Sequence, residues 1–246
     1  MNRFTAALLA SALIAVPVTA MAQAPSAEIT AAVNDSARPA ANKEQDANRK
    51  PGEVLAFAGV KPSMVVAELG SGGGYYTRLL AKAVGPNGKV LAIATKGQAD
   101  RPGGLDGLNA IKAAYPNVQI VVVPDLASIA LPEKADLFWT TENYHDFHNG
   151  PTANIAGLDK AVFDNLKPGG VFYVEDHSAA KGAGLEATSK FHRMDEDVAK
   201  SELTAAGFKI ASEGNLLRNA SDNKASSNSE SGHFVTDRFM LRAQKP

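Results

Sequence analysis

The chain has no cysteine among its 246 residues. Disulfide bonds, thiolate nucleophiles and cysteine ligands to a metal are therefore excluded from its fold and from its chemistry. The lack of cysteine also fits an oxidising compartment, although it does not by itself identify one.

The chain also lacks an excess of charge of one sign. It contains 25 Lys and Arg residues against 26 Asp and Glu residues, which gives a formal net charge of -1. A nucleic-acid partner would need a basic surface, so we expect none. Hydrophobic residues make up 45% of the chain and charged residues 21%, a balance that predicts one large domain with a packed core.

After its first residues, the chain has no apolar run long enough to cross a bilayer. The first residues have the pattern of a secretory signal peptide: Arg3 precedes an apolar stretch, residues 4–18, and the cleavage pattern Ala20-Met21-Ala22 follows. We therefore expect residues 1–22 to be removed and the protein to be periplasmic or secreted, without an integral membrane segment.

The stretch from Met64 to Val84 organises the rest of the chain. A short apolar run ends in Glu68, and the glycine-rich segment 70–74 (GSGGG) follows it. Apolar residues then recur at helical spacing, at Tyr76, Leu79, Leu80, Ala83 and Val84. Glycine permits a sharp turn and lets a ligand approach the backbone, so this strand, turn and helix predict a nucleotide-type α/β site.

The remaining chain alternates between the two kinds of element. Residues 23–49 show little periodicity and are expected to form a linker and an arm before a domain at 50–246. Further strands are expected at 90–94, 118–123, 135–140, 171–175, 207–210 and 233–242, and helices at 51–58, 105–115, 152–166 and 194–206. The run 118–123 (VQIVVV) is β-branched at every position except Gln119, which is typical of a strand buried on both faces. The alternation predicts a doubly wound, seven-stranded sheet that ends in an antiparallel hairpin.

The motif at 68–77, E-L-G-S-G-G-G-Y-Y-T, resembles the first motif of class I S-adenosylmethionine-dependent methyltransferases. The phrase L-K-P-G-G at 166–170 is a second recurrent feature of that family. With N-Y-H-D-F-H-N at 143–149, the chain resembles a narrower group of exported, predicted bacterial methyltransferases. The resemblance implies a Rossmann-like sheet with helices on both faces, S-adenosylmethionine as cofactor, and methyl transfer to a small-molecule acceptor.

The resemblance also implies a set of cofactor-binding residues. The first carboxylate and the turn after it would hold the methionine part of the cofactor, which points to Glu68, Gly70, Ser71, Gly72 and Gly74. Asp125 would bind the adenine amino group, although a helix cap is an equally good interpretation of this residue. The second strand ends at Thr95, where the family usually has a carboxylate for the ribose hydroxyls. Thr95 can accept one hydrogen bond but lacks the paired, charge-assisted geometry of a carboxylate.

A second candidate cluster consists of histidines at the strand ends. His145, Asp146 and His148 follow the fourth strand, and His177 follows the fifth. Adjacent strand ends lie about 5 Å apart, so these four side chains could face one pocket, with His192 reaching over it. They could supply a general base, His145 or His148, beside the methyl donor. They could instead form a metal site of two histidines and a carboxylate, or a hydrogen-bonded loop network.

Two functions therefore remain open from the sequence. The first is a methyltransferase, which the intact glycine turn favours. The second is an exported, non-catalytic binding module on the same fold, with a ligand or metal held by His145, His148 and His177, which the missing carboxylate at Thr95 favours.

Overall fold

The structure is a computed structural model that describes residues 24–232 and 235–246. The predicted signal peptide, residues 1–22, lies outside the described residues, as does His233. In the described part of the chain, no helix combines the length and the apolar character needed to cross a membrane.

One seven-stranded sheet forms the centre of the described fold, with the strand order β3-β2-β1-β4-β5-β7-β6. The strands are β1 (Val65–Leu69), β2 (Lys89–Thr95), β3 (Val118–Val123), β4 (Ala135–Thr141), β5 (Leu166–His177), β6 (Lys209–Gly214) and β7 (Arg238–Gln244). All neighbouring pairs are parallel except those that involve β7, which runs antiparallel to both β5 and β6. The predicted seven-stranded sheet with a terminal antiparallel hairpin is thus confirmed.

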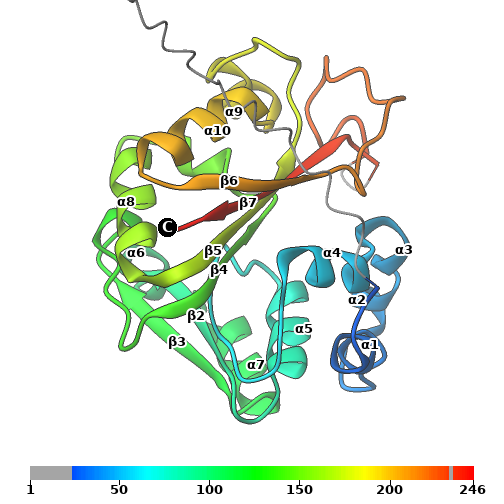
Figure 1. Cartoon of the computed structure of the whole chain (residues 1–246), viewed down its shortest axis with the longest axis vertical. Helices are drawn as coiled ribbons and strands as arrows, with labels where there is room; N and C mark the ends of the chain where they lie inside the picture. Colours follow the sequence, from blue (N-terminus) through cyan, green and yellow to red (C-terminus); the bar gives the residue numbers. More distant parts are fainter. Residues whose placement is uncertain (1–23, 233–234) are drawn as a thin grey trace, which may run out of the picture.

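Helices cover both faces of this sheet (Figure 1). One face packs against α1 (Ala27–Val33), α4 (Pro51–Ala58), α5 (Tyr75–Val84) and α7 (Asp106–Ala114). The other face packs against α8 (Ile155–Asn165) and α10 (Glu196–Ala205). The shorter elements are α2 (Ala40–Lys43), α3 (Asp46–Arg49), α6 (Lys96–Ala99), α9 (Glu186–Phe191) and the 3-10 turns η1 (Leu126–Ser128) and η2 (Asp146–His148).

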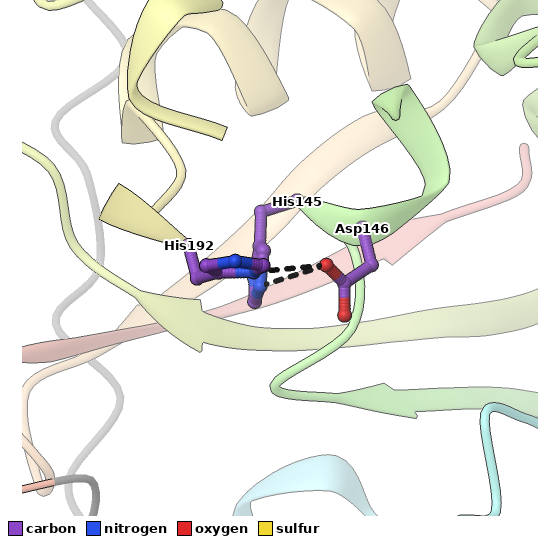
Figure 2. Close-up of side chains that lie close together, drawn as sticks. All are labelled: His145, Asp146 and His192. Atoms are coloured by element: carbon purple, nitrogen blue, oxygen red, sulfur yellow. Dashed lines mark hydrogen bonds and ion pairs between the residues drawn. The ribbon is translucent and has the colours of Figure 1, made fainter. Parts of the chain in front are cut away.

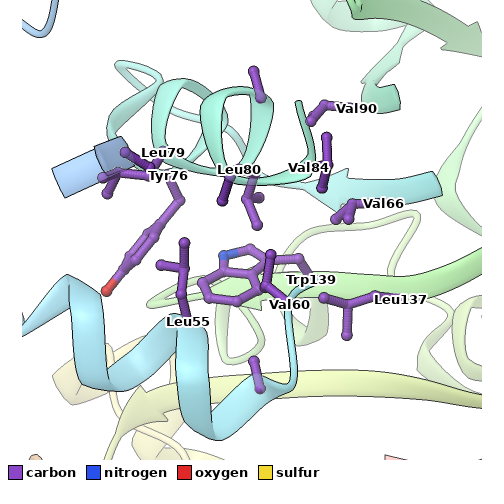
Figure 3. Packing of buried hydrophobic residues seen from close by; sticks show 14 of the residues in the cluster. Leu55, Val60, Val66, Tyr76, Leu79, Leu80, Val84, Val90, Leu137 and Trp139 are labelled. Carbon is purple, nitrogen blue, oxygen red and sulfur yellow. The ribbon is translucent and has the colours of Figure 1, made fainter. Parts of the chain in front are cut away.

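The core is built by alternation along the central strands. In β1, Val66 faces the α5 side, whereas Ala67 and Leu69 face the α8 side. Trp139 of β4 is fully buried, and its ring lies 4.9 Å from that of Tyr76 and 4.4 Å from that of Tyr173, centroid to centroid. Figure 3 shows this indole among Leu55, Val60 and Leu80. Tyr76 and Trp139 therefore belong to the core on the α5 side of the sheet.

The third strand differs from its prediction. The sequence predicts burial on both faces for residues 118–123, but Val122 is 48% exposed, and only Val118 and Val123 are fully buried. The reason is position: β3 is an edge strand of the sheet, and the helices leave the middle of its faces partly uncovered. A β-branched run reports strand propensity, and it does not report where in the sheet the strand lies.

The amino-terminal arm is helical and belongs to the same core. Ile29 and Ala32 of α1 are buried against α5. Arg38 makes a bidentate ion pair with Asp46, at 2.6 and 2.9 Å, and the Tyr75 hydroxyl donates to Asp46 at 2.6 Å. The sequence did not predict these helices, because the charged residues of the arm are not spaced three or four residues apart as partners on one helix are. Their partners lie in α5 or across a turn instead.

Candidate functional site

The glycine turn between β1 and α5 has the backbone that its sequence predicts. Gly70, Gly72 and Gly74 have φ values of +67°, +50° and +74°, in the left-handed region that favours glycine. A Cβ atom at Gly74 would lie 2.0 Å from Cδ1 of Ile111, so this position also has no space for a side chain. The turn therefore leaves space beside its main chain at Gly72 and Gly73, whereas side chains of Asn143 and Ile111 lie against Gly70 and Gly74.

Glu68 braces this turn from inside the fold. Its carboxylate is 2% exposed and accepts hydrogen bonds from the Thr77 hydroxyl at 2.6 Å and from the Ser71 hydroxyl at 3.0 Å. Burial raises the pKa of Glu68 to about 7, although both hydrogen bonds act in the opposite direction. Glu68 thus links the end of β1 to the glycine turn through Ser71 and to the first turn of α5 through Thr77.

A cavity of about 610 Å³ lies at the carboxyl ends of β2, β3 and β4. We call it the strand-end cavity. Its walls are Thr95, residues 124–128, and side chains after β4 that include Asp146, Phe147 and Asn149. The glycine turn follows the neighbouring strand, since Leu69 of β1 pairs with Ile93 of β2. The volume lies within the roughly 300–1,000 Å³ that is usual for cofactor and small-molecule sites.

Thr95 and Asp125 meet at this cavity, but they differ in how they are bound. The Thr95 hydroxyl accepts a hydrogen bond from the Gln98 backbone N–H at 3.2 Å and caps α6. Within the described part of the chain, the Asp125 side chain makes no capping hydrogen bond to η1, which it precedes. The cap interpretation of Asp125 therefore has no support here, and its carboxylate is available to a ligand in the cavity.

After β4, the backbone places His145 against the buried Asp176 of β5. Nδ1 of His145 lies 2.7 Å from Oδ1 of Asp176, and the His145 backbone N–H donates to Oδ2 at 2.7 Å. Asp176 is 0% exposed and His145 is 2% exposed. Burial alone would lower the pKa of His145, but the carboxylates of Asp176 and Asp146 together raise it to about 10. The contact between Nδ1 and Asp176 holds the imidazole in one orientation.

Asp146 and His192 complete the group on the side away from Asp176 (Figure 2). Oδ1 of Asp146 lies 3.3 Å from Nε2 of His145 and 3.3 Å from Nδ1 of His192. Both histidines lower the pKa of Asp146, His145 the more strongly. We call these three residues the His145–Asp146–His192 cluster.

The structure divides the four side chains that the sequence placed in one pocket. His145 and Asp146 lie together, with His192 reaching over as expected, whereas His177 bonds Thr236 through Nδ1 at 2.7 Å. Consecutive strand residues face opposite sides of a sheet, so Asp176, rather than His177, faces His145. The His145 and His177 ring centroids are 6.0 Å apart.

His148 also leaves the group. Its Nε2 lies 3.0 Å from a carboxylate oxygen of Glu202 in α10, and its Nδ1 lies 3.0 Å from the Tyr144 carbonyl oxygen. The Tyr144 hydroxyl donates to Asp159 at 2.9 Å. His148 therefore ties η2 to the helices on the α8 side of the sheet, which is the loop-network interpretation for this one residue.

Sequence reasoning gave no role to two groups at this edge. Asn143 contacts the glycine turn: its Nδ2 donates to the Gly70 carbonyl at 3.1 Å, and a Cβ at Gly70 would approach its side chain to 2.7 Å. Glu142, at φ +56°, pairs with Arg49 of the arm at 2.7 Å and with Arg238 at 2.8 Å. Asn143 and Glu142 directly follow β4, and that position was the available signal.

The sequence matches no protein-family model and none of the curated proteins with which it was compared. Solved structures do match. A SAM-dependent methyltransferase from Aquifex aeolicus is 20% identical, with a TM-score of 0.59 over 87% of this chain and 97% of that one. Aeropyrum pernix fibrillarin, described as having natively bound S-adenosyl-L-methionine, is 14% identical, with a TM-score of 0.52 over 81% and 76%.

A third similar structure, the [4+2]-cyclase SpnF, is 13% identical, with a TM-score of 0.59 over 93% of this chain and 99% of that one. At these identities the likeness concerns the fold, which agrees with the strand order and with the helices on both faces. The chain has the Rossmann-like fold of the class I S-adenosylmethionine-dependent methyltransferases.

Proposed function

We propose that the protein is an S-adenosylmethionine-dependent methyltransferase that acts on a small molecule. One observation carries the proposal: the strand-end cavity brings Thr95 and the ligand-available Asp125 together at the ends of β2 and β3, next to the strand β1 that leads into the glycine turn. The fold shared with solved methyltransferases supports the same assignment.

The residues present fit this cofactor. The backbone of Gly70, Gly72 and Gly74 would hold its methionine part, and the Asp125 carboxylate would accept a hydrogen bond from the adenine amino group. Thr95 would face the ribose with one hydroxyl, which already accepts a bond from Gln98. We therefore expect weaker cofactor binding than a carboxylate at this position would give.

The chemistry follows from where the polar side chains stand. Bound S-adenosylmethionine would supply an electrophilic methyl group. Asp146, on the cavity wall, can accept a hydrogen bond from a nucleophile bound there, and Asp176 fixes His145 behind it. Alignment of the nucleophile would provide most of the rate. We assign no catalytic role to His148, which is bound to Glu202, or to His177, which is bound to Thr236.

Isothermal titration with S-adenosylmethionine and with S-adenosylhomocysteine tests the proposal. We expect saturable binding of one molecule per chain, weakened about 10-fold or more in Asp125→Ala, because a hydrogen bond to a charged group contributes about 1.5–3 kcal/mol. Glu133→Gln is the control, since this carboxylate pairs with Lys89 at the amino end of β2, away from the cavity at the carboxyl ends. No heat with either compound would remove the enzyme assignment.

A second candidate is a non-catalytic binding module on the same fold. The threonine at position 95 favours it, and the SpnF structure, described as a [4+2]-cyclase, has a name that does not mention methyl transfer. A protein that binds neither compound, but retains another ligand through purification, would support this candidate.

We also propose export, on the basis of residues 1–22. Fusion of these residues to a reporter that is active only outside the cytoplasm should give an active reporter. An inactive reporter that stays in the cytoplasm would contradict export.

A further inference from the structure

We propose that His145, Asp146 and His192 form a site for one divalent transition metal ion, with Zn²⁺ as the representative ion. One nitrogen of each histidine and one oxygen of Asp146 lie within 4.8 Å of one another. This set differs from the His145, His148 and His177 set that the sequence suggested, and the proposal does not depend on methyl transfer. Imidazole and carboxylate are ligands that zinc accepts together.

The spacing of the ligand atoms is the first argument (Figure 2). Oδ1 of Asp146 lies 3.3 Å from the nearest nitrogen of His145 and 3.3 Å from that of His192. In a tetrahedral site with bonds of about 2.0–2.1 Å, two ligand atoms are about 3.3–3.4 Å apart. Charge-assisted hydrogen bonds are shorter, about 2.7–2.9 Å, and the bond from His145 to Asp176 is 2.7 Å. The two contacts of Asp146 thus match edges of a coordination tetrahedron better than direct hydrogen bonds.

The second argument is the support behind His145. Asp176, fully buried, accepts from Nδ1 and from the backbone N–H of His145, and it also accepts from the His177 backbone N–H at 2.8 Å. This leaves Nε2 of His145 directed at Asp146. A carboxylate bound to the far nitrogen of a histidine is the usual partner of a metal-binding imidazole, since it fixes the ring and raises its basicity.

The third argument is the fixed position of His192. Its neighbour Arg193 is 0% exposed and makes a bidentate ion pair with Asp222, at 2.7 and 3.0 Å. His192 itself has φ +50° and ψ +53° at the end of α9, a left-handed conformation that costs a non-glycine residue of order 1 kcal/mol or more. The fold therefore holds this exposed histidine beside Asp146 instead of leaving it on a free loop.

The cluster is open on one side. The His145 side chain is 2% exposed, whereas the side chains of Asp146 and His192 are 48% and 52% exposed. Three protein ligands with an open side leave a coordination position for water or for an oxygen of a bound molecule. Asp146 also lines the strand-end cavity, so this open position lies at the cavity's rim.

Metal binding tests the proposal without any cofactor. Protein treated with a chelator and then dialysed is titrated with ZnCl₂ by calorimetry, and with Co²⁺ by visible absorption. We expect one Zn²⁺ per chain and a Co²⁺ spectrum typical of four-coordinate nitrogen and oxygen ligands. His192→Ala and Asp146→Asn should each weaken Zn²⁺ binding about 10-fold or more. Loss of a residue that only hydrogen-bonds a metal ligand already weakens binding about 10-fold, and loss of a ligand should cost at least as much.

The variants are chosen so that folding does not confuse the result. His192 and Asp146 are about half exposed, and thermal unfolding of each variant verifies the fold. Glu133→Gln, near the amino ends of β2 and β4, should bind Zn²⁺ like the wild type. Absence of Zn²⁺ binding would show that the cluster is a set of ion pairs only. Binding that survives in both variants would place the metal elsewhere. Either result overturns the proposal.

Discussion

Nδ1 of His145 and Oδ1 of Asp176 lie 2.7 Å apart. His145 belongs to the loop after β4, and Asp176 is the second-last residue of β5. Both side chains are buried, and each fixes the other. This contact joins two neighbouring strand ends at the edge where α/β folds bind their ligands. It positions the His145–Asp146–His192 cluster beside the strand-end cavity.

Asp176→Asn should lower the free energy of unfolding by about 1–3 kcal/mol, because an amide cannot accept at both positions and one buried donor loses its partner. Urea unfolding measures this change. Asp164→Asn is the matched control: its exposed pair with Lys160 on α8 should contribute less than about 0.5 kcal/mol. Equal effects in the two variants would show that Asp176 does not anchor the loop.

Glu68 should make stability fall as pH rises from about 5 to about 7. Its pKa is raised from 4.5 to about 7 in the folded protein, so between these values the folded state holds a proton that the unfolded state has released. The raised pKa corresponds to a contribution of about 3 kcal/mol to the free energy of unfolding, which is present below pH 4.5 and lost by pH 7.

Glu68→Gln removes this contribution. The change in unfolding free energy between pH 5 and pH 7.5 should be smaller in the variant than in the wild type, and Glu133→Gln should leave it unchanged. Glu175 and Asp159 also have pKa values raised to about 7 by burial, so part of the pH dependence will remain in the variant. Parallel pH curves for wild type and Glu68→Gln would contradict the prediction.

Gly74→Ala should be more harmful than the same change at a comparable glycine. A Cβ at Gly74 would meet Ile111 at 2.0 Å, whereas at Gly184, with φ +61°, nothing lies within 4 Å. Both variants carry the cost of a left-handed alanine, and the steric overlap should add about 1–3 kcal/mol at Gly74 only. Thermal or urea unfolding of the pair isolates this overlap. If both variants lose the same stability, the turn is looser than the structure shows.

Arg49→Ala should loosen the arm from the sheet. Arg49 pairs with Glu142 at 2.7 Å and lies over the Tyr75 ring, 4.7 Å from its centroid. Removing one partner of a buried ion pair costs about 3–5 kcal/mol. Limited proteolysis should therefore cut residues 24–49 faster in this variant. Lys50→Ala is the control, since the Lys50 side chain is exposed and its Nζ donates to the Leu216 carbonyl. An unchanged cleavage rate would contradict a role for Arg49 in docking the arm.

Much of the fold was readable from the sequence because it depends on local patterns. The glycine turn at 70–74, the helix after it and the acidic start of α10 at Asp195 all follow from backbone preferences within a few residues. Thr95 and Asp125 were placed at the same edge by the rule for parallel strand ends, and the structure brings both to one cavity.

The histidine grouping could not be read in the same way. It depends on which side of β5 Asp176 and His177 point to, and on where the loop that carries His192 lies relative to β4. Contacts between residues distant in sequence determine both. The strand predicted at 171–175 in fact begins at Leu166, because Ala135 pairs with Leu166 and the register then shifts. The helical arm likewise depends on Tyr75 and Glu142, far from it in the chain.

A crystal structure of the protein grown with S-adenosylhomocysteine tests the central claim most directly. We expect the adenine beside Asp125 in the strand-end cavity and the homocysteine part against the backbone of Gly70, Gly72 and Gly74. A cavity left empty at saturating ligand, or a ligand bound away from Asp125 and the glycine turn, would contradict the methyltransferase assignment and leave only the fold.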